Sequence, residues 1–391
     1  YGEGFFTNCV IGHLWHMIPG AHYKRMYGED YMTHSYELID QHADHLHWVG
    51  KKWGESRGNT PEQDKAGGGH AHVGAMIYLA DNWPKKYRNM IGMCNVHGQR
   101  LNFDKLERQG SGYVGRRGHD LFFANDDWFR GITVKYGPDG GVYISDWCDY
   151  GECHDNDGVH CQSGRIYKVT YGEPHHPPKD LDITKMTLQQ LITWQYHKND
   201  WYVRRSRLEL QRRAACGEDM SRVHDSFGYV NKEVFLSKRR NTFYNLRELW
   251  ALHVTGGTNS EFLTALLDVE DEYMRKWGIH LLAESTSANR PLAEESRRKF
   301  VALANDDNSP VVRLALASAL QRIPVKQRWE IATALVDHEE DNDDHNLPLM
   351  IWYGIESAVA ADRTKALQLA SKCKLSKVRQ FIAKRVASGS N

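Results

Sequence analysis

The sequence lacks an excess of charge of either sign: among its 391 residues, 50 Lys and Arg balance 50 Asp and Glu. Such a chain has no strong electrostatic attraction to nucleic acid or to an anionic membrane surface. It also lacks an apolar run of about 18 residues, the length that a membrane-spanning helix needs. The nearest candidate, residues 347–361, is interrupted by Pro348, Gly354 and Glu356. We therefore expect no nucleic-acid partner and no membrane span in this chain.

Cysteine is scarce, and its number is odd: seven residues do not make a disulfide framework in a chain of this size. Three of the seven crowd into one loop, at Cys148, Cys153 and Cys161. Two interpretations of this loop stay open. The first is a disulfide that joins Cys153 to Cys148 or Cys161. The second is a widened c-type haem attachment pattern, C-x4-C-H, in which His154 follows Cys153 as the proximal ligand. The remaining interpretations are free thiols, or metal binding in which Cys148, Cys153, His154 and Cys161 form a tetrahedral zinc site.

The composition is that of a folded chain, with 41% hydrophobic residues and 12 Trp. Short runs of β-branched and aromatic residues alternate with turn residues between positions 67 and 171. Residues 132–136 and 142–145 flank a Gly-Pro-Asp-Gly-Gly turn, which predicts a β-hairpin. Similar runs occur at 75–79, 90–96 and 165–171. Repeated short strands at this spacing are typical of a sandwich or a propeller.

Histidine is concentrated in the first 172 residues, which hold 13 of the 21. A buried neutral imidazole needs partners for both ring nitrogens, so the enrichment indicates a functional site in this half. The GGGHAH segment at 67–72 is the best candidate, because its glycines allow close backbone approach and its H-x-H spacing puts His70 and His72 on one side of an extended segment. The functional interpretation of these two residues is a pair of metal ligands or a general base. The structural interpretation is a loop in which one His makes a hydrogen bond. A second group, H-x-x-H-x-H at 42–47, either faces the same site or has a structural role in the core or at an interface.

The β-type pattern ends near residue 172. The segment EPHHPPK at 173–179 predicts a linker, and apolar residues three and four apart predict helices from 187 to 387. Six helical segments repeat at a mean spacing of about 35 residues, which is typical of paired helices that stack into a solenoid. They align on Arg204, Arg247, Arg275, Arg313, Met350 and Arg379. We expect the aligned arginines to bond acids of the preceding turn, such as Asp306 or Asp307.

Two long motifs carry a resemblance to a known family: GAMIYLADNWPKKYRNMIGMCNVHGQRL at 74–101 and WFRGITVKYGPDGGVYISDW at 128–147. They resemble the late blades of the soluble glucose/sorbosone dehydrogenase β-propellers, which use pyrroloquinoline quinone. The whole chain, from FFTNCVIGHLWHMIPGAH at 5–22 through GRIYKVTYG at 164–172 and on into the helices, resembles the large "membrane-bound dehydrogenase domain" proteins of planctomycetes.

The resemblance implies a fold and a domain division. Residues 1–172 would be a partial β-propeller made of C-terminal blades, residues 173–186 a linker, and residues 187–391 an all-α solenoid of HEAT repeats. A blade takes roughly 40 to 45 residues, so residues 1–172 supply about four at most. Because an incomplete propeller leaves sheet edges unpaired, we expect the other blades on a missing N-terminal portion or a companion chain. The concave face of the solenoid would dock a protein partner.

The resemblance also implies an exported, periplasmic sugar or polyol dehydrogenase that depends on a quinone. His70 or His72 would take the proton from the substrate hydroxyl. Arg130, which precedes the GPDG turn, would hold the carboxylates of pyrroloquinoline quinone; pairing with Asp126 or Asp127 is its alternative role. The other cofactor-binding candidates are Trp128, Asp127 and Asn125. Candidate oxygen ligands for calcium are Asp126, Asp146 and Asp149.

Two other functions stay open. In one, the assembly has no catalytic activity and is a scaffold or a carbohydrate-binding component of a larger complex. In the other, the loop of Cys148, Cys153 and His154 binds haem c and the protein carries electrons. A cytochrome c is the electron-accepting partner that the family resemblance implies, because the sequence itself contains no C-x-x-C-H motif.

Overall fold

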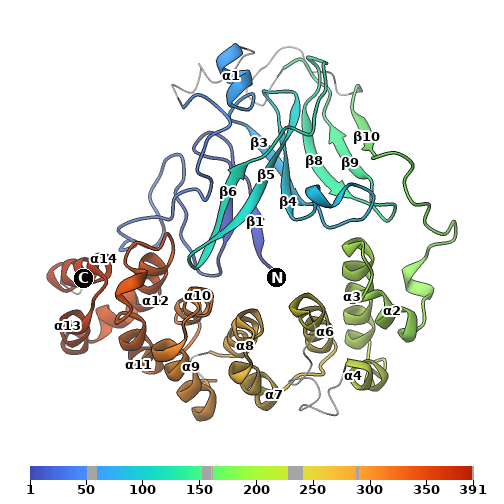
Figure 1. The fold of residues 1–391 in the computed structure, drawn as a ribbon. Coiled ribbons are helices and arrows are strands. Elements are labelled where there is room, and N and C mark those ends of the chain that lie inside the picture. The colour runs from blue at the N-terminus through green and yellow to red at the C-terminus, as the bar shows by residue number, and fades with distance from the viewer. Residues whose placement is uncertain (51–59, 152–159, 161, 228–240, 288–289, 390–391) are drawn as a thin grey trace.

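The computed structural model describes residues 1–50, 60–151, 160, 162–227, 241–287 and 290–389. Its strands lie in the first part of the chain, up to Val169, and its helices from Leu188 onward form an arc on one side of the strands (Figure 1). Among the described residues, none of the helices is long and apolar enough to cross a membrane.

The strands form three antiparallel sheets. The first pairs β1 (Gly4–Phe6) with β2 (Trp15–Met17). The second has the order β3 (His72–Ile77), β4 (Met90–Asn95), β5 (Arg100–Gln109) and β6 (Gly112–Arg117), and β7 (Phe122–Phe123) also pairs with β5. The third has the order β10 (Arg165–Val169), β9 (Val142–Asp146) and β8 (Gly131–Tyr136). Strands β8 and β9 are the predicted hairpin.

The central strand β4 is buried on both faces, and its two faces differ in what they contact. Met90 and Cys94 pack into the core between the second and third sheets. Ile91 and Met93 pack with Leu14 of the N-terminal segment. Side chains alternate between the faces of a strand, so the face of β4 that carries Ile91 and Met93 is covered by the N-terminal segment.

The predicted fold class, a partial β-propeller joined to a HEAT solenoid, is wrong. The described structure is mixed, with 42% helix and 17% strand in small sheets, and no closed propeller is seen in it. The long strand β5 illustrates how the strands group. One of its edges pairs with β4 over residues 100–105, and the other pairs with β7 at residues 100–101 and with β6 over residues 104–109, so this second edge changes partner along its length. Hairpin patterns are local, and they do not fix how hairpins group into sheets.

The N-terminal segment consists of residues 7–50, which include β2 and precede helix α1 (Pro61–Ala66), and it is held by partners far away in the sequence. Ile18 and Ile39 belong to the core of the helical part. The indole of Trp352 donates to the carbonyl of His34, and the hydroxyl of Tyr353 donates to the carbonyl of Glu37. This segment therefore connects the sheets to the helices.

The inner row of the arc consists of helices that contact one another in turn: α3 (Asp200–Ala215), α6 (Thr242–Val254), α8 (Glu272–Glu284), α10 (Pro310–Ala319) and α12 (Leu347–Ala361). The others are α2 (Leu188–Trp194), α4 (Ser221–Phe227), α7 (Ser260–Ala265), α9 (Glu294–Asp306), α11 (Val325–Leu335), α13 (Arg363–Lys372) and α14 (Ser376–Ala387). Short 3₁₀ turns occur at Lys85–Tyr87, Ile183–Lys185, Leu266–Asp268 and Glu339–Asp341.

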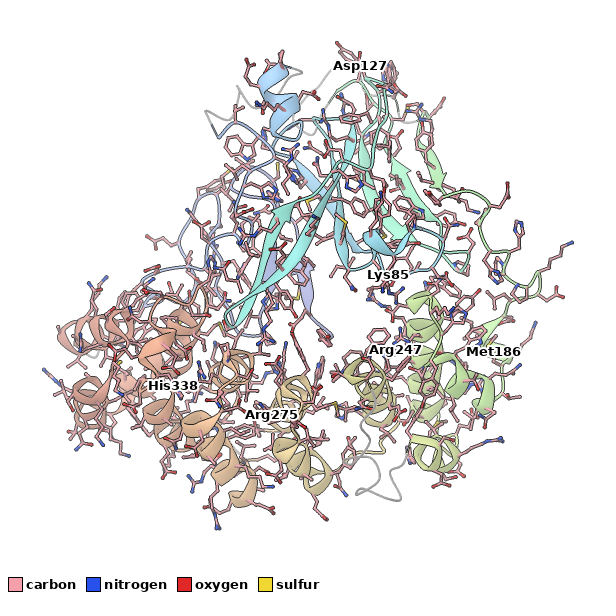
Figure 2. The ribbon with its side chains drawn as sticks, viewed as in Figure 1. Lys85, Asp127, Met186, Arg247, Arg275 and His338 are labelled. Carbon is pink, nitrogen blue, oxygen red and sulfur yellow. The ribbon has the colours of Figure 1, made fainter. Side chains whose placement is uncertain are left out.

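Buried or half-buried arginines connect neighbouring members of this row, and two of them, Arg247 and Arg275, are labelled in Figure 2. Arg247 of α6 donates to Asp200 at the start of α3. Arg275 of α8 instead bonds Asp307, and Arg313 of α10 bonds Asp341, so both arginines reach the turn that follows. Such bidentate pairs between a guanidinium and a carboxylate fix geometry as well as charge. Three of the aligned arginines are thus structural, although two pair with the following turn and not with the preceding one.

Asn199 joins the helical part to the third sheet. Its side-chain oxygen caps α3 by accepting from the backbone N–H of Trp201, at 3.0 Å. Its side-chain nitrogen donates to the carbonyls of Gly137 and Pro138 in the turn between β8 and β9, at 3.0 and 3.2 Å. Asn241 caps α6 in the same way, through the N–H of Phe243, but is exposed.

The two caps give a matched test of this junction. We expect Asn241→Ala to lower the free energy of unfolding by about 1 kcal/mol, the usual effect of a lost cap. Asn199→Ala should lower it by about 2–3 kcal/mol, since the two hydrogen bonds to the carbonyls of Gly137 and Pro138 are lost as well. Urea unfolding curves of the two variants check this, and equal losses would contradict the assignment of Asn199 to the junction.

Candidate metal centre

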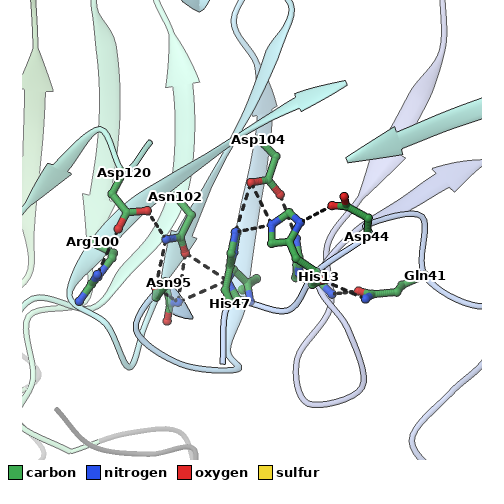
Figure 3. Close-up of polar contacts among 12 residues, drawn as sticks. His13, Gln41, Asp44, His47, Asn95, Arg100, Asn102, Asp104 and Asp120 are labelled. Carbon is green, nitrogen blue, oxygen red and sulfur yellow. Dashed lines mark hydrogen bonds and ion pairs between the residues drawn. The ribbon is translucent and has the colours of Figure 1, made fainter. Parts of the chain in front are cut away.

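Four side chains converge on the face of the second sheet that the N-terminal segment covers: His13, His45, His47 and Asp104 (Figure 3). One ligand atom from each lies within 4.8 Å of all the others. In the described part of the chain, this is the one group of three or more His, Cys or acidic side chains that meets this distance.

The Asp104 carboxylate is the centre of the group. Its Oδ2 lies 2.9 Å from Nε2 of His13. Its Oδ1 lies 3.2 Å from Nε2 of His47 and 3.4 Å from Nε2 of His45. The Nε2 atoms of His45 and His47 are 3.1 Å apart. Ligands bound about 2.0–2.2 Å from a tetrahedral zinc ion stand about 3.3–3.6 Å from one another. The spacings of His45 and His47 from Oδ1 and from each other are close to this value, and the whole group lies within 4.8 Å.

Strand register brings the polar residues of the sheet to this place. Asp104 on β5 pairs with Ile91 of β4, and Asn102 pairs with Met93 two residues away, so both point to the face that the N-terminal segment covers. Asn95 and its partner His72 lie at the end of the same face. The sequence alternates apolar and polar residues at 101–104 because Leu101 and Phe103 pack into the core on one face of β5, whereas Asn102 and Asp104 point to the other face.

The three histidine ligands come from the N-terminal segment. The N–H of His42 bonds the carbonyl of Leu14, and Gly115 of β6 bonds the backbone of both His42 and Asp44. These bonds place residues 42–47 along the edge of the sheet, beside the stretch that carries His13. Gln41 fixes the two stretches further, because its side chain accepts from the N–H of His13 and donates to the carbonyl of His45.

The glycine loop closes the cluster on the other side. Gly67, Gly68 and Gly69 all have positive φ, at 137°, 105° and 151°. A Cβ on Gly69 would lie 2.4 Å from the Cβ of His97, and one on Gly67 would lie 2.8 Å from the Cβ of His47. Only glycine fits such close approaches at positive φ.

A second layer of polar groups holds the ligands. The Asp44 carboxylate accepts from Nδ1 of His45 at 2.8 Å, and Arg116 pairs with Asp44. His72 lies behind His47, with its Nε2 2.9 Å from Nδ1 of that ring. Partners of this kind orient metal-ligating histidines and tune their basicity.

Burial and charge set the protonation of the cluster. Burial raises the pKa of Asp104, but hydrogen bonds from His13, His45 and His47 outweigh this and bring it well below the usual value. Burial, with repulsion from His47, lowers the pKa of His13 to about 4. Burial lowers the pKa of His45, but hydrogen bonds to Asp104 and Asp44 outweigh it and raise the pKa above its usual value. A carboxylate and mostly neutral imidazoles are the protonation states that bind metal.

His70 and His72, the pair predicted from the sequence, lie in different places in the structure. His72 belongs to the second layer of the cluster, and its side chain is 1% exposed. His70 is also buried, but its ring contacts those of His97 and Trp48. The two residues of the H-x-H pattern therefore have different surroundings, and neither is open to a substrate.

Arg130 has partners within its own hairpin. Its guanidinium donates to the carbonyls of Asp127, Phe129 and Tyr150, at 2.7 to 2.9 Å. Of the two roles considered for this arginine, holding the local structure is the one that these bonds favour. Asn125 and Asp127 are exposed, and the Trp128 ring lies 4.5 Å from that of His160. Asp127 lies at the end of the sheets farthest from the helices (Figure 2).

The carboxylates of the candidate calcium ligands accept hydrogen bonds from other protein groups. Arg165 bridges Asp126 and Asp146, at 2.8 and 3.0 Å. Asp149 accepts from both the backbone and the ring of His160. No three of the acidic candidates form a ligand group within the described residues. Cys148 is a buried free thiol. Cys153, His154 and Cys161 lie outside the described residues.

Sequence reasoning missed the ligands His13 and Asp104, and it gave His45 and His47 only a secondary place. Asp104 is one of two acids in NFDKLE, a stretch with no metal spacing. A signal was present: alternation in 101–104, LNFD, predicts that Asn102 and Asp104 share a face opposite two apolar residues.

Comparisons with known proteins find a similarity over the part of the chain that carries the cluster, and they give no activity. Residues 1–173 match the family model described as "Domain of unknown function (DUF7133)". No curated protein matches the chain. A crystal structure of an engineered protein is 19% identical, covering 52% of this chain and 100% of that chain with a TM-score of 0.35.

The glycine loop gives a prediction for folding. We expect Gly69→Ala to destabilise the protein by more than about 1 kcal/mol, because φ is positive and the new methyl would meet His97. Gly256→Ala is the control: φ is 78° there, but nothing lies within 4 Å of the added Cβ. Thermal unfolding of both variants separates the backbone effect from the steric one. Equal destabilisation would show that the close approach to His97 does not matter.

The cluster also predicts loss of stability in acid for the metal-free protein. The pKa of His13 falls from about 6.5 in the unfolded chain to about 4 in the folded one. The unfolded chain therefore binds more protons between these pH values. Stability is full above pH 6.5 and falls by about 3 kcal/mol as pH drops to 4. Burial lowers the pKa of His42 to about 3, which adds to the loss, while the raised pKa of His45 opposes it.

Unfolding at several pH values, with a chelator present, measures this slope. The variant His13→Gln keeps an N–H donor toward Asp104 but does not titrate, so its slope should be shallower. The exposed His119, replaced by Gln, should leave the slope unchanged. A wild-type slope equal to that of His13→Gln would be inconsistent with a buried neutral His13.

Proposed function

We propose that this protein binds one divalent transition-metal ion in its N-terminal part, through Nε2 of His13, His45 and His47 and a carboxylate oxygen of Asp104. The observation that carries the proposal is the convergence of these four ligand atoms within 4.8 Å of one another. Imidazole and carboxylate ligands suit Zn, Fe, Cu and Ni, and availability and geometry decide among them. Zn(II), which prefers four ligands of this kind, is the ion that the set fits best.

The alternative role for the four side chains is a hydrogen-bonded polar core. Asp104 accepts from three imidazoles, and that network stands without an ion. A buried hydrogen bond to a charged group is worth about 1.5–3 kcal/mol. A zinc ion bound by four protein ligands contributes about 10–16 kcal/mol in small domains. The metal-bound state is therefore more stable than the metal-free hydrogen-bonded network wherever the ion is available.

The ion would have a structural role. All four ligands are protein side chains, and a set closed in this way is typical of structural sites. The side chains of His13, His47 and Asp104 are at most 1% exposed, and that of His45 is 17% exposed. The ion would tie the N-terminal segment, which has little regular structure, to β5. His45 marks the side from which the ion enters.

The quinone-dependent dehydrogenase that the family resemblance implies has less support from this geometry. Its base must reach a substrate, whereas His70 and His72 are 2% and 1% exposed. Its cofactor needs a free guanidinium, whereas Arg130 donates to three carbonyls. The cluster of ligands, in contrast, meets the geometric needs of a metal ion with the residues as they stand.

Metal analysis of the purified protein tests the proposal. We expect one equivalent of Zn(II) per chain, and a tetrahedral Co(II) spectrum after exchange of the ion. His47→Ala should weaken Zn(II) binding by roughly 100- to 1,000-fold, since four ligands share about 10–16 kcal/mol. His119→Ala, an exposed histidine outside the cluster, is the matched control and should bind as the wild type does.

Stability gives a second measurement. At a free ion concentration 1,000 times the dissociation constant, binding should add about 4 kcal/mol to the free energy of unfolding of the wild type, and little to that of Asp104→Asn. A wild-type protein that binds no divalent metal ion, or that binds one equally well without His47, would refute the proposal.

A further inference from the structure

His72 contacts the proposed centre without belonging to its ligand set. Its Nε2 lies 2.9 Å from Nδ1 of His47, the ring nitrogen that points away from Asp104. The same Nε2 lies 3.2 Å from Oδ1 of Asn102. Its other nitrogen, Nδ1, is buried and has no hydrogen-bond partner within the described residues.

The amides around His72 have a fixed orientation. The amide nitrogen of Asn102 donates to Asp120 at 2.7 Å and to the carbonyl of Gly67 at 3.0 Å, so its oxygen must face His72. The amide nitrogen of Asn95 lies 3.3 Å from Nε2 of His72 and 3.1 Å from Oδ1 of Asn102. Its two hydrogens have acceptors in the carbonyls of Gly67 and Gly69, at 2.9 and 3.1 Å, and so are not needed by Nε2 of His72. An oxygen that faces Nε2 of His72 calls for a proton on that nitrogen.

This requirement sets the protons of the pair when no ion is bound. His72 carries its proton on Nε2, and Nδ1 of His47 accepts from it. His47 then carries its own proton on Nε2 and donates to Asp104 and His45, at 3.2 and 3.1 Å. Every N–H of the pair has an acceptor. The unpartnered Nδ1 of His72 is a bare lone pair, which is less costly than an unpaired donor.

Ion binding through Nε2 of His47 reverses this arrangement. That nitrogen must lose its proton, and Nδ1 of His47 must gain one and donate to Nε2 of His72. His72 must then carry its proton on Nδ1, where it has no acceptor among the described residues. The pair holds two protons before and after, both rings stay neutral, and no proton is released by the pair itself.

We propose that binding of the ion switches the tautomers of His47 and His72 together, and that His72 thereby weakens metal affinity. This inference depends on the proposed metal centre. His72 is a positioning residue, because it acts on the ion through His47. A buried N–H without an acceptor should weaken binding by about 10-fold, which makes the ion exchangeable. Nδ1 of His13 is buried in the same way, but replacing His13 would also remove a ligand.

Affinity measurements on variants of His72 give one test, with Zn(II) as the probe and a competing chelator in the assay. Glutamine can rotate its amide to donate to His47 or to accept from it, so ion binding leaves no additional N–H unpaired. We expect His72→Gln to bind Zn(II) about 10-fold more tightly than the wild type. His72→Leu offers no acceptor, so Nδ1–H of His47 is unpaired in place of Nδ1–H of His72, and this variant should bind about as tightly as the wild type. His119→Gln is the surface control and should bind unchanged.

The tautomers can be observed directly in the full-length wild-type protein, which covers the case in which a variant fails to fold. Nitrogen-15 NMR of the imidazoles should show the proton of His72 on Nε2 in the metal-free protein and on Nδ1 after one equivalent of Zn(II). A His72 that keeps its proton on Nε2 in the Zn(II) form would overturn the inference. So would a folded His72→Gln that binds no more tightly than the wild type. A wild type that binds no metal at all would refute the metal centre itself, which is a different result.

Discussion

The structure of the N-terminal part depends on one buried carboxylate. Asp104 lies on a strand in the middle of the sheet, and its relative exposure is 0%. An unpaired charge at such a place would be very costly. Three imidazoles surround it, and all three come from a segment that has almost no regular secondary structure. The need to satisfy Asp104 therefore fixes the path of residues 13–47 across the sheet.

The same segment also contacts the helical part. Beyond the cluster, His42 bonds Asn346 just before α12, at 2.8 Å, and Trp352 and Tyr353 bond carbonyls of residues 34 and 37. Ile39 lies in the core of the helices. The N-terminal segment is bound to Asp104 of the sheet on one side and to α12 and the residue before it on the other, so it connects the sheets to the helices. Metal binding at Asp104 would thus act on the contact between the sheets and the helices.

The protein uses its polar residues in two different ways. In the helical arc, buried arginines form pairs with carboxylates and backbone carbonyls, and the helices themselves supply the rest of the stability through an apolar core. Around Asp104, histidines, asparagines and carbonyl groups form a network in which each proton position depends on the next. The first arrangement fixes shape. The second has proton positions that the proposed ion would rearrange.

The sequence alone determined the local features of this protein. Alternation and turn residues located the β8–β9 hairpin, and the 3.6-residue period located helices after position 187. These signals depend on neighbours along the chain. Tertiary structure decided how the hairpins group, because one edge of β5 changes partner along its length, and no local pattern records that change. It also decided the site. His13 and Asp104 meet across 91 residues, and their meeting depends on strand register and on a segment without a period of its own. The glycine-rich motif at 67–72 marked the right region, but His72 stands behind the ligands because only packing decides which imidazole reaches the carboxylate.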